Sequence, residues 1–297
     1  MLKSPGRGPD IAPLDGADLD GAQALVAESG WNQVRADWEL FTGLGAAFKV
    51  LRADGEVAAT AATLPYSGFG WISMVLVAKS QRRMGIATAL LEHCIAHLRD
   101  RSLVPVLDAT PAGREVYRPL GFHDGWPITR WRRQTPRAAS LDASASASAA
   151  SASAVEVLPL RDAGWPQVSA LDSTAFGADR TPLLRRLHAR SAQFACVAER
   201  GGRVEGYLLG RNGRQATQVG PIIAHDPDVA SALLAHALAR IDGAVLLDVL
   251  DRHTHFAPLL GAAGFAVERS YTRMTLDRAT PFGDASMMAA IAGPELG

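Results

Sequence analysis

The pattern of apolar and polar residues predicts alternating helices and strands in the first half of the chain. Apolar residues at helical spacing run from Asp18 to a stop signal at Gly30, and a second helix follows Arg35. From Phe48, the run FKVLRADGEVAAT consists of a strand, a polar turn and a second strand, which predicts a β-hairpin. The run WISMVLVA from Trp71 is apolar and rich enough in β-branched residues to form a central strand.

Four of these patterns recur in the same order in the second half, which indicates an internal duplication. Each copy predicts helix, hairpin, long strand, helix, strand, helix and strand. That order is typical of an α/β or layered α+β fold in which a mixed sheet is flanked by helices. The matching runs are FKVLRADGEVAAT with FACVAERGGRVEGY, ATALLEH with ASALLAH, VPVLDA with AVLLDV, and GFHDGWPITRW with GFAVERSYTRM.

An Ala/Ser-rich run, RAASLDASASASAASASA from Arg137, separates the two copies. It has almost no charge or bulk with which to build a core, so we expect a flexible linker. The predicted organisation is a first domain at 8–135, a linker at 136–154, a second domain at 155–280 and a tail at 281–297. For the tail, FGDASMMAAIAGPELG, we expect a short helix packed on a domain or a partner.

Composition excludes several classes of protein. Acidic and basic residues balance at 30 each, so no overall field favours nucleic acid or an anionic membrane. Cys94 and Cys196, the two cysteines, give neither metal-ligand spacing nor a disulfide framework. No run reaches the ~18 apolar residues of a membrane span, and the first residues lack an apolar secretion signal. We therefore expect a cytoplasmic protein.

The run KSQRRMGIA from Lys79 carries the clearest chemistry. It joins the predicted central strand to a helix, and the first N–H groups of a helix attract phosphates. Gly85 and Ala87 would let the backbone approach an anion closely, and Arg82 and Arg83 would add positive charge. The alternative interpretation of the arginines is a solvated, charged turn.

The run RRMGIA, between a strand and a helix, resembles the Arg/Gln-x-x-Gly-x-Gly/Ala pattern of the GNAT superfamily of N-acyltransferases. In that family the pattern holds the pyrophosphate of coenzyme A. LDATPAGREVYRPLGF, from Leu107, is similar to the family's penultimate strand and following helix, with a tyrosine four residues before Gly-Phe. GWNQVRADW from Gly30 resembles the acceptor-side opening of some members. The resemblance covers most of 8–135 and, more faintly, 155–280.

The resemblance implies roles for particular residues and names acetyl-CoA, or another acyl-CoA, as co-substrate without a metal. Tyr117 would protonate the departing thiolate as general acid, the alternative being a packing tyrosine. Backbone groups of the strand would bind the pantetheine amides, and the loop would cradle the pyrophosphate. The strand residues are Val75, Leu76 and Val77, and the cradle residues are Arg82, Arg83, Gly85, Ile86, Ala87 and Thr88.

A general base is harder to assign. Many members of the family place a glutamate on this strand, whereas the run WISMV here has only Ser73 as a polar residue. Either Ser73 or a backbone carbonyl holds a water that removes the proton, or the amine arrives neutral. Asp37, Glu39 and Asp108 are further candidates, but Asp108 recurs as Asp248, which favours a structural role.

The second copy lacks the cofactor signals. Its loop is AHDPDVA, in which Pro227 removes one N–H donor and Asp228 adds negative charge, and Leu260 replaces the tyrosine. We therefore predict a degenerate, non-catalytic domain that covers the acceptor pocket or supplies a dimer surface.

The run LLDVLDRHTHF from Leu246 holds two aspartates and two histidines that invite a metal interpretation. The spacing of His253 and His255 favours helix capping and surface histidines instead.

These features predict an acyl-CoA-dependent N-acyltransferase. Its expected acceptor is a small amine or an amino-acid-like molecule, which attacks the thioester directly in a ternary complex. Nucleic acid and membranes are not expected partners, and a homodimer is left open. The alternative functions are a non-catalytic acyl-CoA sensor and a dimerisation protein.

Overall fold

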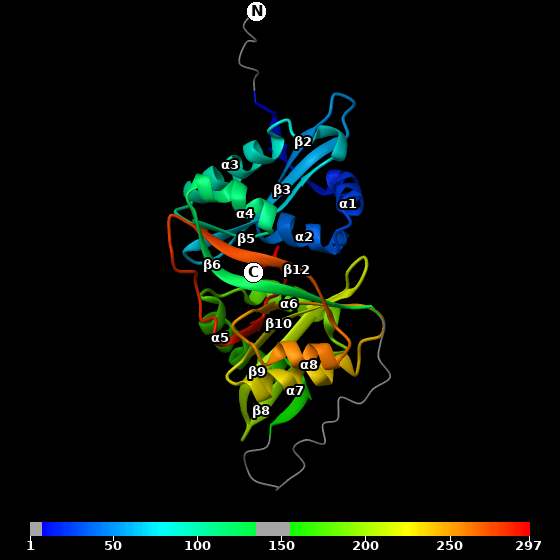
Figure 1. Cartoon of the computed structure of the whole chain (residues 1–297), viewed down its shortest axis with the longest axis vertical. Coiled ribbons are helices and arrows are strands. Elements are labelled where there is room, and N and C mark those ends of the chain that lie inside the picture. Colours follow the sequence, from blue (N-terminus) through cyan, green and yellow to red (C-terminus); the bar gives the residue numbers. More distant parts are fainter. Residues whose placement is uncertain (1–7, 135–154) are drawn as a thin grey trace, which may run out of the picture. The chain divides into compact units, whose positions relative to one another are not determined.

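The computed structural model describes residues 8–134 and 155–297, so the predicted linker at 136–154 lies outside the described residues (Figure 1). The described chain divides into two compact units after Val106. This division falls inside one strand, β5 (Val104–Ala109), rather than between the two copies of the sequence repeat.

The first unit is a mixed sheet with helices on both faces. Strands β1 to β4 are antiparallel neighbours, and β5 joins β4 in parallel. Figure 1 shows α3 on one side of β2 and β3, with α1 and α2 on the other. Its elements are β1 (Ile11–Pro13), α1 (Leu19–Glu28), α2 (Arg35–Leu44), β2 (Ala46–Leu51), β3 (Val57–Pro65), β4 (Phe69–Val77), α3 (Ile86–Arg99) and the start of β5.

Close packing of α3 on the sheet depends on a glycine. A Cβ atom added at Gly70 of β4 would lie 2.4 Å from a methyl carbon of Leu98 in α3, so only glycine leaves room for the helix here. On the other face, Trp38 of α2 and Trp71 of β4 are fully buried. The helices, hairpin and strands predicted for this half are therefore present.

The second unit contains α4 and a run of neighbouring strands, some parallel and some antiparallel. Its strands lie in the order β12–β6–β11–β13–β10–β9–β8–β7. The elements are α4 (Pro111–Tyr117), β6 (Phe122–Arg133), β7 (Glu156–Pro159), α5 (Trp165–Phe176), α6 (Thr181–Ser191), β8 (Cys196–Arg200), β9 (Arg203–Arg211), β10 (Thr217–Ala224), α7 (Pro227–Leu238), β11 (Val245–Leu250), α8 (Phe256–Ala262), β12 (Ala266–Leu276) and β13 (Met288–Ala290).

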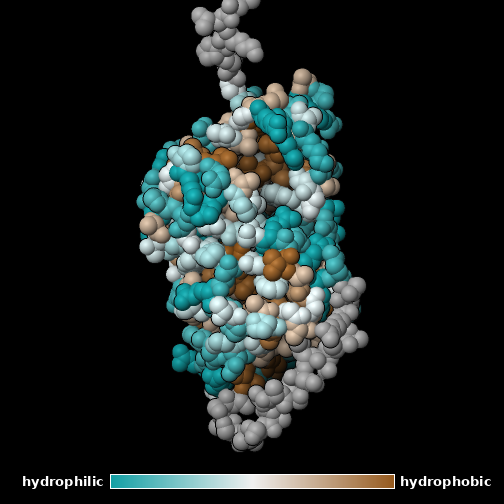
Figure 2. All heavy atoms as spheres, in the orientation of Figure 1, coloured by the Kyte–Doolittle hydropathy of each residue, from teal (hydrophilic) through white to brown (hydrophobic). Residues whose placement is uncertain are grey.

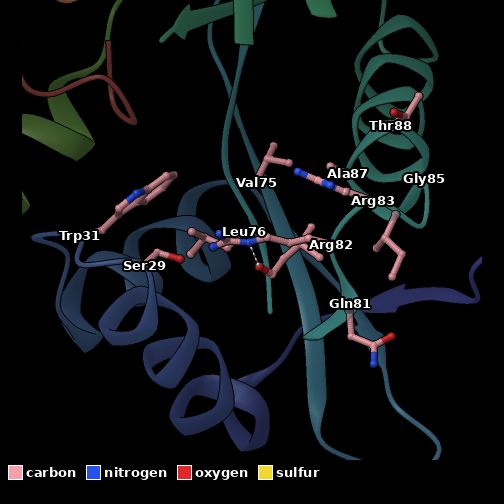
Figure 3. A pocket seen from close by; sticks show the side chains of 12 residues that line it. Ser29, Trp31, Val75, Leu76, Gln81, Arg82, Arg83, Gly85, Ala87 and Thr88 are labelled. Atoms are coloured by element: carbon pink, nitrogen blue, oxygen red, sulfur yellow. Dashed lines mark hydrogen bonds between the residues drawn. The ribbon is translucent and has the colours of Figure 1, made fainter. Parts of the chain in front are cut away.

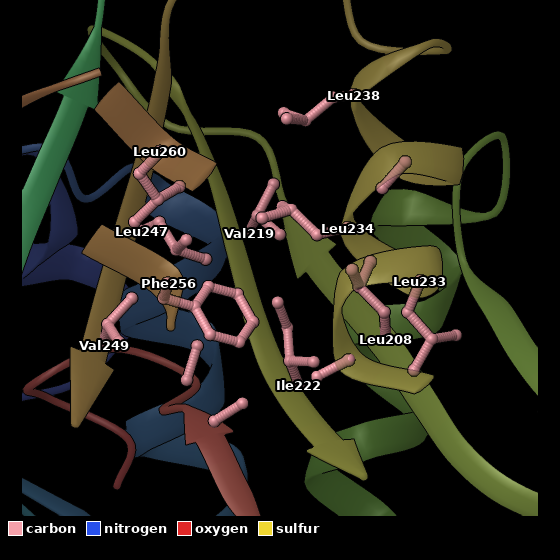
Figure 4. Packing of buried hydrophobic residues seen from close by; sticks show 14 of the residues in the cluster. Leu208, Val219, Ile222, Leu233, Leu234, Leu238, Leu247, Val249, Phe256 and Leu260 are labelled. Carbon is pink, nitrogen blue, oxygen red and sulfur yellow. The ribbon is translucent and has the colours of Figure 1, made fainter. Parts of the chain in front are cut away.

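The core of this unit joins two helices to the sheet. In Figure 4, Leu233 and Leu234 of α7 and Phe256 of α8 point toward Leu208 and Val219 on the strands. All five side chains are fully buried. The predicted leucine face of the ASALLAH helix is thus the face that packs on the sheet.

Strand β6 lies between two strands of the second copy, although it is the last strand of the first copy. It is antiparallel to β11, with Arg130 opposite Asp248, and antiparallel to β12, with Thr129 opposite Ser270. The order of elements along the sequence does not reveal this pairing, because a strand can join any sheet edge that its connections allow it to reach.

The prediction of a short helix in the tail is wrong. Residues Met288–Ala290 form β13, a short strand between β10 and β11. Alanine and methionine favour helices in isolation, but backbone groups of two strands are available to this segment. Tertiary hydrogen bonding here overrides a weak local preference.

The face of the molecule shown in Figure 2 is mostly polar. On the face shown in Figure 2, hydrophobic residues appear as small groups among hydrophilic ones. Within 8–134 and 155–297, none of the helices combines the length and the hydrophobicity that crossing a bilayer requires.

Candidate functional site

A cavity of about 440 Å³ lies in the first unit between the end of α1, strand β4 and the start of α3 (Figure 3). All nine residues predicted to bind the cofactor line it. The structure also adds three residues that the prediction did not include. The complete lining is Ser29, Trp31, Val75, Leu76, Val77, Gln81, Arg82, Arg83, Gly85, Ile86, Ala87 and Thr88.

The strand side of the cavity is formed where β4 leaves its ladder with β5. The two strands pair in parallel only from Phe69 to Trp71 on β4. Met74 then adopts a positive φ of 53°, and the register with β3 shifts nearby, which marks a β-bulge. The residues after the bulge, 75–77, are apolar and line the cavity.

The loop side presents positive charge and an unusual backbone. Arg83 has a φ of 65° and Gly85 a φ of 79°, so two residues in this short loop lie in the left-handed region. Successive N–H groups in such turns converge into an anion-binding concavity. The Arg82 side chain is held across the cavity by a hydrogen bond from its Nε to the carbonyl oxygen of Val77, at 3.2 Å.

The first turn of α3 faces the same cavity. Gly85 is its N-cap, and no side chain of the described residues caps it, so its first N–H groups are available to a ligand. In the second copy the corresponding helix, α7, is capped by Asp226, whose carboxylate accepts a hydrogen bond from the N–H of Val229 at 2.9 Å. The positive end of α3 is therefore open, while that of α7 already has an anion.

Comparison with known proteins places both halves of the chain in one family. Residues 23–122 match the model described as acetyltransferase (GNAT) family, and residues 168–287 match a second, described as acetyltransferase (GNAT) domain. The chain belongs to the GNAT acetyltransferase family, with two GNAT domains in tandem.

Individual relatives agree with this assignment over nearly the whole length. The chain is 23% identical to the uncharacterized N-acetyltransferase YitH of Bacillus subtilis, over 95% of this chain and 96% of the relative. A putative acetyltransferase from Pyrococcus horikoshii has the same fold, with a TM-score of 0.77, 18% identity and coverage of 100% and 99% of the two chains. A tandem GNAT protein from the clavulanic acid biosynthesis pathway has a TM-score of 0.63 and 16% identity, covering 90% of this chain and 97% of its own.

In this GNAT protein, Ser73 is placed on β4 immediately before the bulge. It is 9% exposed, and its Oγ has no hydrogen-bond partner among the residues that the structure describes. A buried hydroxyl without a partner costs free energy unless a water or a ligand satisfies it. The geometry is thus compatible with the predicted role of Ser73 in holding a water, which remains a prediction.

The carboxylates considered as general bases are engaged elsewhere. Asp37 is fully buried and its carboxylate accepts a hydrogen bond from the N–H of Val34 at 2.8 Å, at the start of α2. Asp108 binds the guanidinium of Arg273 through two hydrogen bonds of 3.0 Å. Glu39 lies 3.5 Å from Arg35 on the surface of α2. Two of the three candidates are therefore structural.

Tyr117 is the last residue of α4, in the second compact unit. Arg114 and Arg118, on either side of it, both bind Asp124 of β6; the two bonds from Arg114 are 2.7 Å long. These bonds hold the pKa of Asp124 below its usual value and fix the end of the helix on the strand. Burial raises the pKa of the Tyr117 phenol, which keeps it protonated near neutral pH, as a general acid must be.

The second copy shows no such site at the matching positions. Leu260, which stands where the first copy has Tyr117, is fully buried in the core. His253 is 2.9 Å, through Nε2, from the carbonyl oxygen of Ala285. Within the described ranges, no group of three or more His, Cys, Asp or Glu side chains is arranged to hold a metal ion.

Two of the three lining residues outside the prediction had partial signals in the sequence. Trp31 belongs to the run GWNQVRADW, which resembles an acceptor-side opening, and Gln81 lies next to the predicted cradle. Ser29 had no signal of its own, since it simply follows α1. Its place in the cavity depends on how α1 packs against β4.

Proposed function

We propose that this protein is an acyl-CoA-dependent N-acyltransferase, with acetyl-CoA as donor and a small amine or amino-acid-like acceptor. The observation that carries the proposal is the cavity of the first unit. It joins an apolar strand edge to a loop with two left-handed residues, two arginines and an uncapped helix start. An acyl-CoA has the same division, with a thin arm at one end and a diphosphate at the other.

Each side of the cavity would bind one part of the donor. The backbone of Val75–Val77, which lies along the cavity, would pair with the amides of the arm. The N–H groups at the start of α3 would bind the diphosphate, with added charge from Arg82 and Arg83. Both arginine side chains extend from the loop toward Val75 and Leu76 in Figure 3.

The reaction would be a direct transfer within a ternary complex. The amine nitrogen attacks the thioester carbonyl carbon, a C–N bond forms, and the C–S bond breaks. A backbone N–H of the strand near Val77 would stabilise negative charge on the carbonyl oxygen. Tyr117 would donate its proton to the departing sulfur. A protonated amine would first lose one proton through a water held at Ser73, or the amine would arrive neutral. After the attack the nitrogen would give up one further proton, which would return through water to the Tyr117 oxygen and restore the phenol.

The second copy has no catalytic role in this proposal. Asp226 caps its helix start, so a diphosphate would not bind there. Leu260 replaces the tyrosine, so no phenol would protonate the leaving thiolate. We place the protein in the cytoplasm, in keeping with two buried cysteines that are both free. Burial raises the pKa of both thiols to about 12, so neither is a reactive thiolate.

The test is a calorimetric titration of acetyl-CoA into the whole protein, followed by an amine screen that measures coenzyme A release. We expect one equivalent to bind, and we expect release to depend on a defined amine. Binding without amine-dependent release would favour the acyl-CoA sensor instead. No binding would refute both functions for acetyl-CoA, and two equivalents would refute the assignment of the second copy.

A further inference from the structure

The segment 284–297 fills a gap in the sheet of the second copy. Strands β10 and β11 pair in parallel from Thr217 to Val219 and then separate. Beyond that point β13 lies between them, with Ala290 opposite Ile222 of β10 and opposite Val249 of β11. The N–H of Ala224 donates to the carbonyl oxygen of Met287 at 2.9 Å.

The same gap in the first copy is part of the cavity. In the repeat, Pro105 of the run VPVLDA matches Val245 of the run AVLLDV. Pro105 is opposite Gly70 of β4, and Val245 is opposite Thr217 of β10. The two parallel ladders can therefore be superposed with Gly70 on Thr217. This places Ile222, Ile223 and Ala224 where the first copy has Val75, Leu76 and Val77. The strand residues that line the cavity in one copy are therefore the ones that bind β13 in the other.

We infer that the segment 284–297 occupies, in the second copy, the place that the acyl-CoA arm takes in the first. This inference rests on the proposed function for the position of the arm. The second copy has thus become a strand-binding domain whose ligand is a segment of its own chain, held by strand addition.

The body of the second unit is shaped to receive this segment. A Cβ atom added at Gly220 would lie 2.0 Å from the carbonyl oxygen of Ile291, and one added at Gly283 would lie 2.2 Å from that of Ala175. Gly177 would approach Gly283 in the same way, at 2.7 Å. Glycine at these three positions allows backbone to pass against backbone, which a larger residue would prevent.

Buried charges also depend on the segment. Arg211 is 2% exposed; it donates a hydrogen bond of 2.6 Å to the carbonyl oxygen of Ala292 and forms an ion pair with Glu295. Arg180, also 2% exposed, donates to the carbonyl oxygen of Gly297 at 2.6 Å. Without the segment, these guanidinium groups would lose buried acceptors. The segment should therefore bind strongly and hold the unit together.

The experiment cuts the connection to the segment in the folded, full-length protein. A specific protease site is inserted after Ala279, in the exposed turn that follows β12. After cleavage, gel filtration and native mass spectrometry report whether the released piece stays bound. A fluorescent peptide of residues 284–297 is then added in excess, and its uptake is measured by anisotropy.

We expect the cleaved segment to stay bound, and the labelled peptide to replace it at one per chain. A peptide with Ala290→Pro, which lacks an N–H in the ladder, should be taken up at least tenfold more weakly. Saturating acetyl-CoA should not displace the labelled peptide.

Two results would overturn the inference. One is departure of the segment after cleavage with no change in the unfolding of the second unit. The other is equally strong uptake of the native peptide and of the Ala290→Pro peptide. Titration of acetyl-CoA into the same cleaved protein tests the proposed function separately. Absence of acetyl-CoA binding both before and after cleavage would refute that function, and with it the comparison to the arm. A lost segment with unchanged unfolding of the second unit and retained acetyl-CoA binding would refute this inference alone.

Discussion

The guanidinium of Arg130 donates two hydrogen bonds, of 2.7 and 2.8 Å, to the carboxylate of Asp248, although the two residues come from different copies of the repeat. A second ion pair, at the matching positions of the repeat, also joins the two copies. Asp108 of the first copy binds Arg273 of the second. Each copy thus supplies the aspartate of one pair and the arginine of the other, because β6 lies beside β11 and the Thr-Arg motif of β12 reaches Asp108.

Removing one partner of the Arg130–Asp248 pair should be costly. Arg130→Met would remove both guanidinium hydrogen bonds from the buried Asp248 carboxylate and leave it, among the described residues, the Gln218 amide, which donates to it at 2.9 Å. We expect a loss of about 3–5 kcal/mol in the free energy of unfolding, and a smaller loss in the double variant with Asp248→Leu. Urea unfolding measures both.

The exposed pair Arg185–Asp162 supplies the control for this measurement. Its side chains are 50% and 97% exposed, so Arg185→Met should cost about 1 kcal/mol or less. If the double variant in the buried pair were no more stable than Arg130→Met alone, the pair would not be the source of the effect.

Gly85→Glu should abolish binding of acetyl-CoA by placing a carboxylate at the helix start and straining a backbone with a φ of 79°. Gly55→Glu is the matched control. Gly55 has a φ of 87° and, like Gly85, open space around an added Cβ atom, but it lies in the hairpin turn away from the cavity. The control should bind one equivalent in calorimetry, and equal loss in both variants would contradict the assignment of the cradle.

Tyr117→Phe should lower amine-dependent turnover by about 10²- to 10⁴-fold, because the phenol that protonates the leaving sulfur is removed. Binding of acetyl-CoA should change less than twofold, since Tyr117 is not among the residues that line the cavity. Tyr66→Phe, at a tyrosine that packs on Phe69, is the control and should leave turnover unchanged. Unaltered turnover in Tyr117→Phe would refute its role as general acid.

The docking of α4 should depend on pH through Asp124. Hydrogen bonds from Arg114 lower the pKa of Asp124 from its usual 3.8, so the folded state holds the proton less tightly than the unfolded state. The stabilising contribution is therefore complete above about pH 5 and is lost as the pH falls below 4 toward the lowered value.

The stability difference between the native protein and Asp124→Asn follows this dependence. Urea unfolding should show a constant difference from pH 7 to 5 and a shrinking one at lower pH. A difference that stayed constant down to pH 3.5 would show that the ion pairs with Arg114 and Arg118 do not contribute.

The sequence by itself determined the features that depend on short-range physics. Apolar periodicity located the helices and strands, the repeat was visible in four runs, and Gly85 with its two neighbouring arginines marked the loop that lines the cavity. These features can be predicted from the sequence because a helix start, a left-handed glycine and an amphipathic face each depend on a few neighbouring residues.

Only the tertiary structure decided how the strands are shared. Nothing in the sequence of β6 shows that it pairs with β11, and the helix-favouring tail became β13. Asp108 and Asp248 had the same appearance in the sequence, yet their partners come from opposite copies. The physical reason is that a strand's hydrogen-bonding groups accept any edge of suitable register, so the choice among edges is made by the whole fold rather than by local sequence.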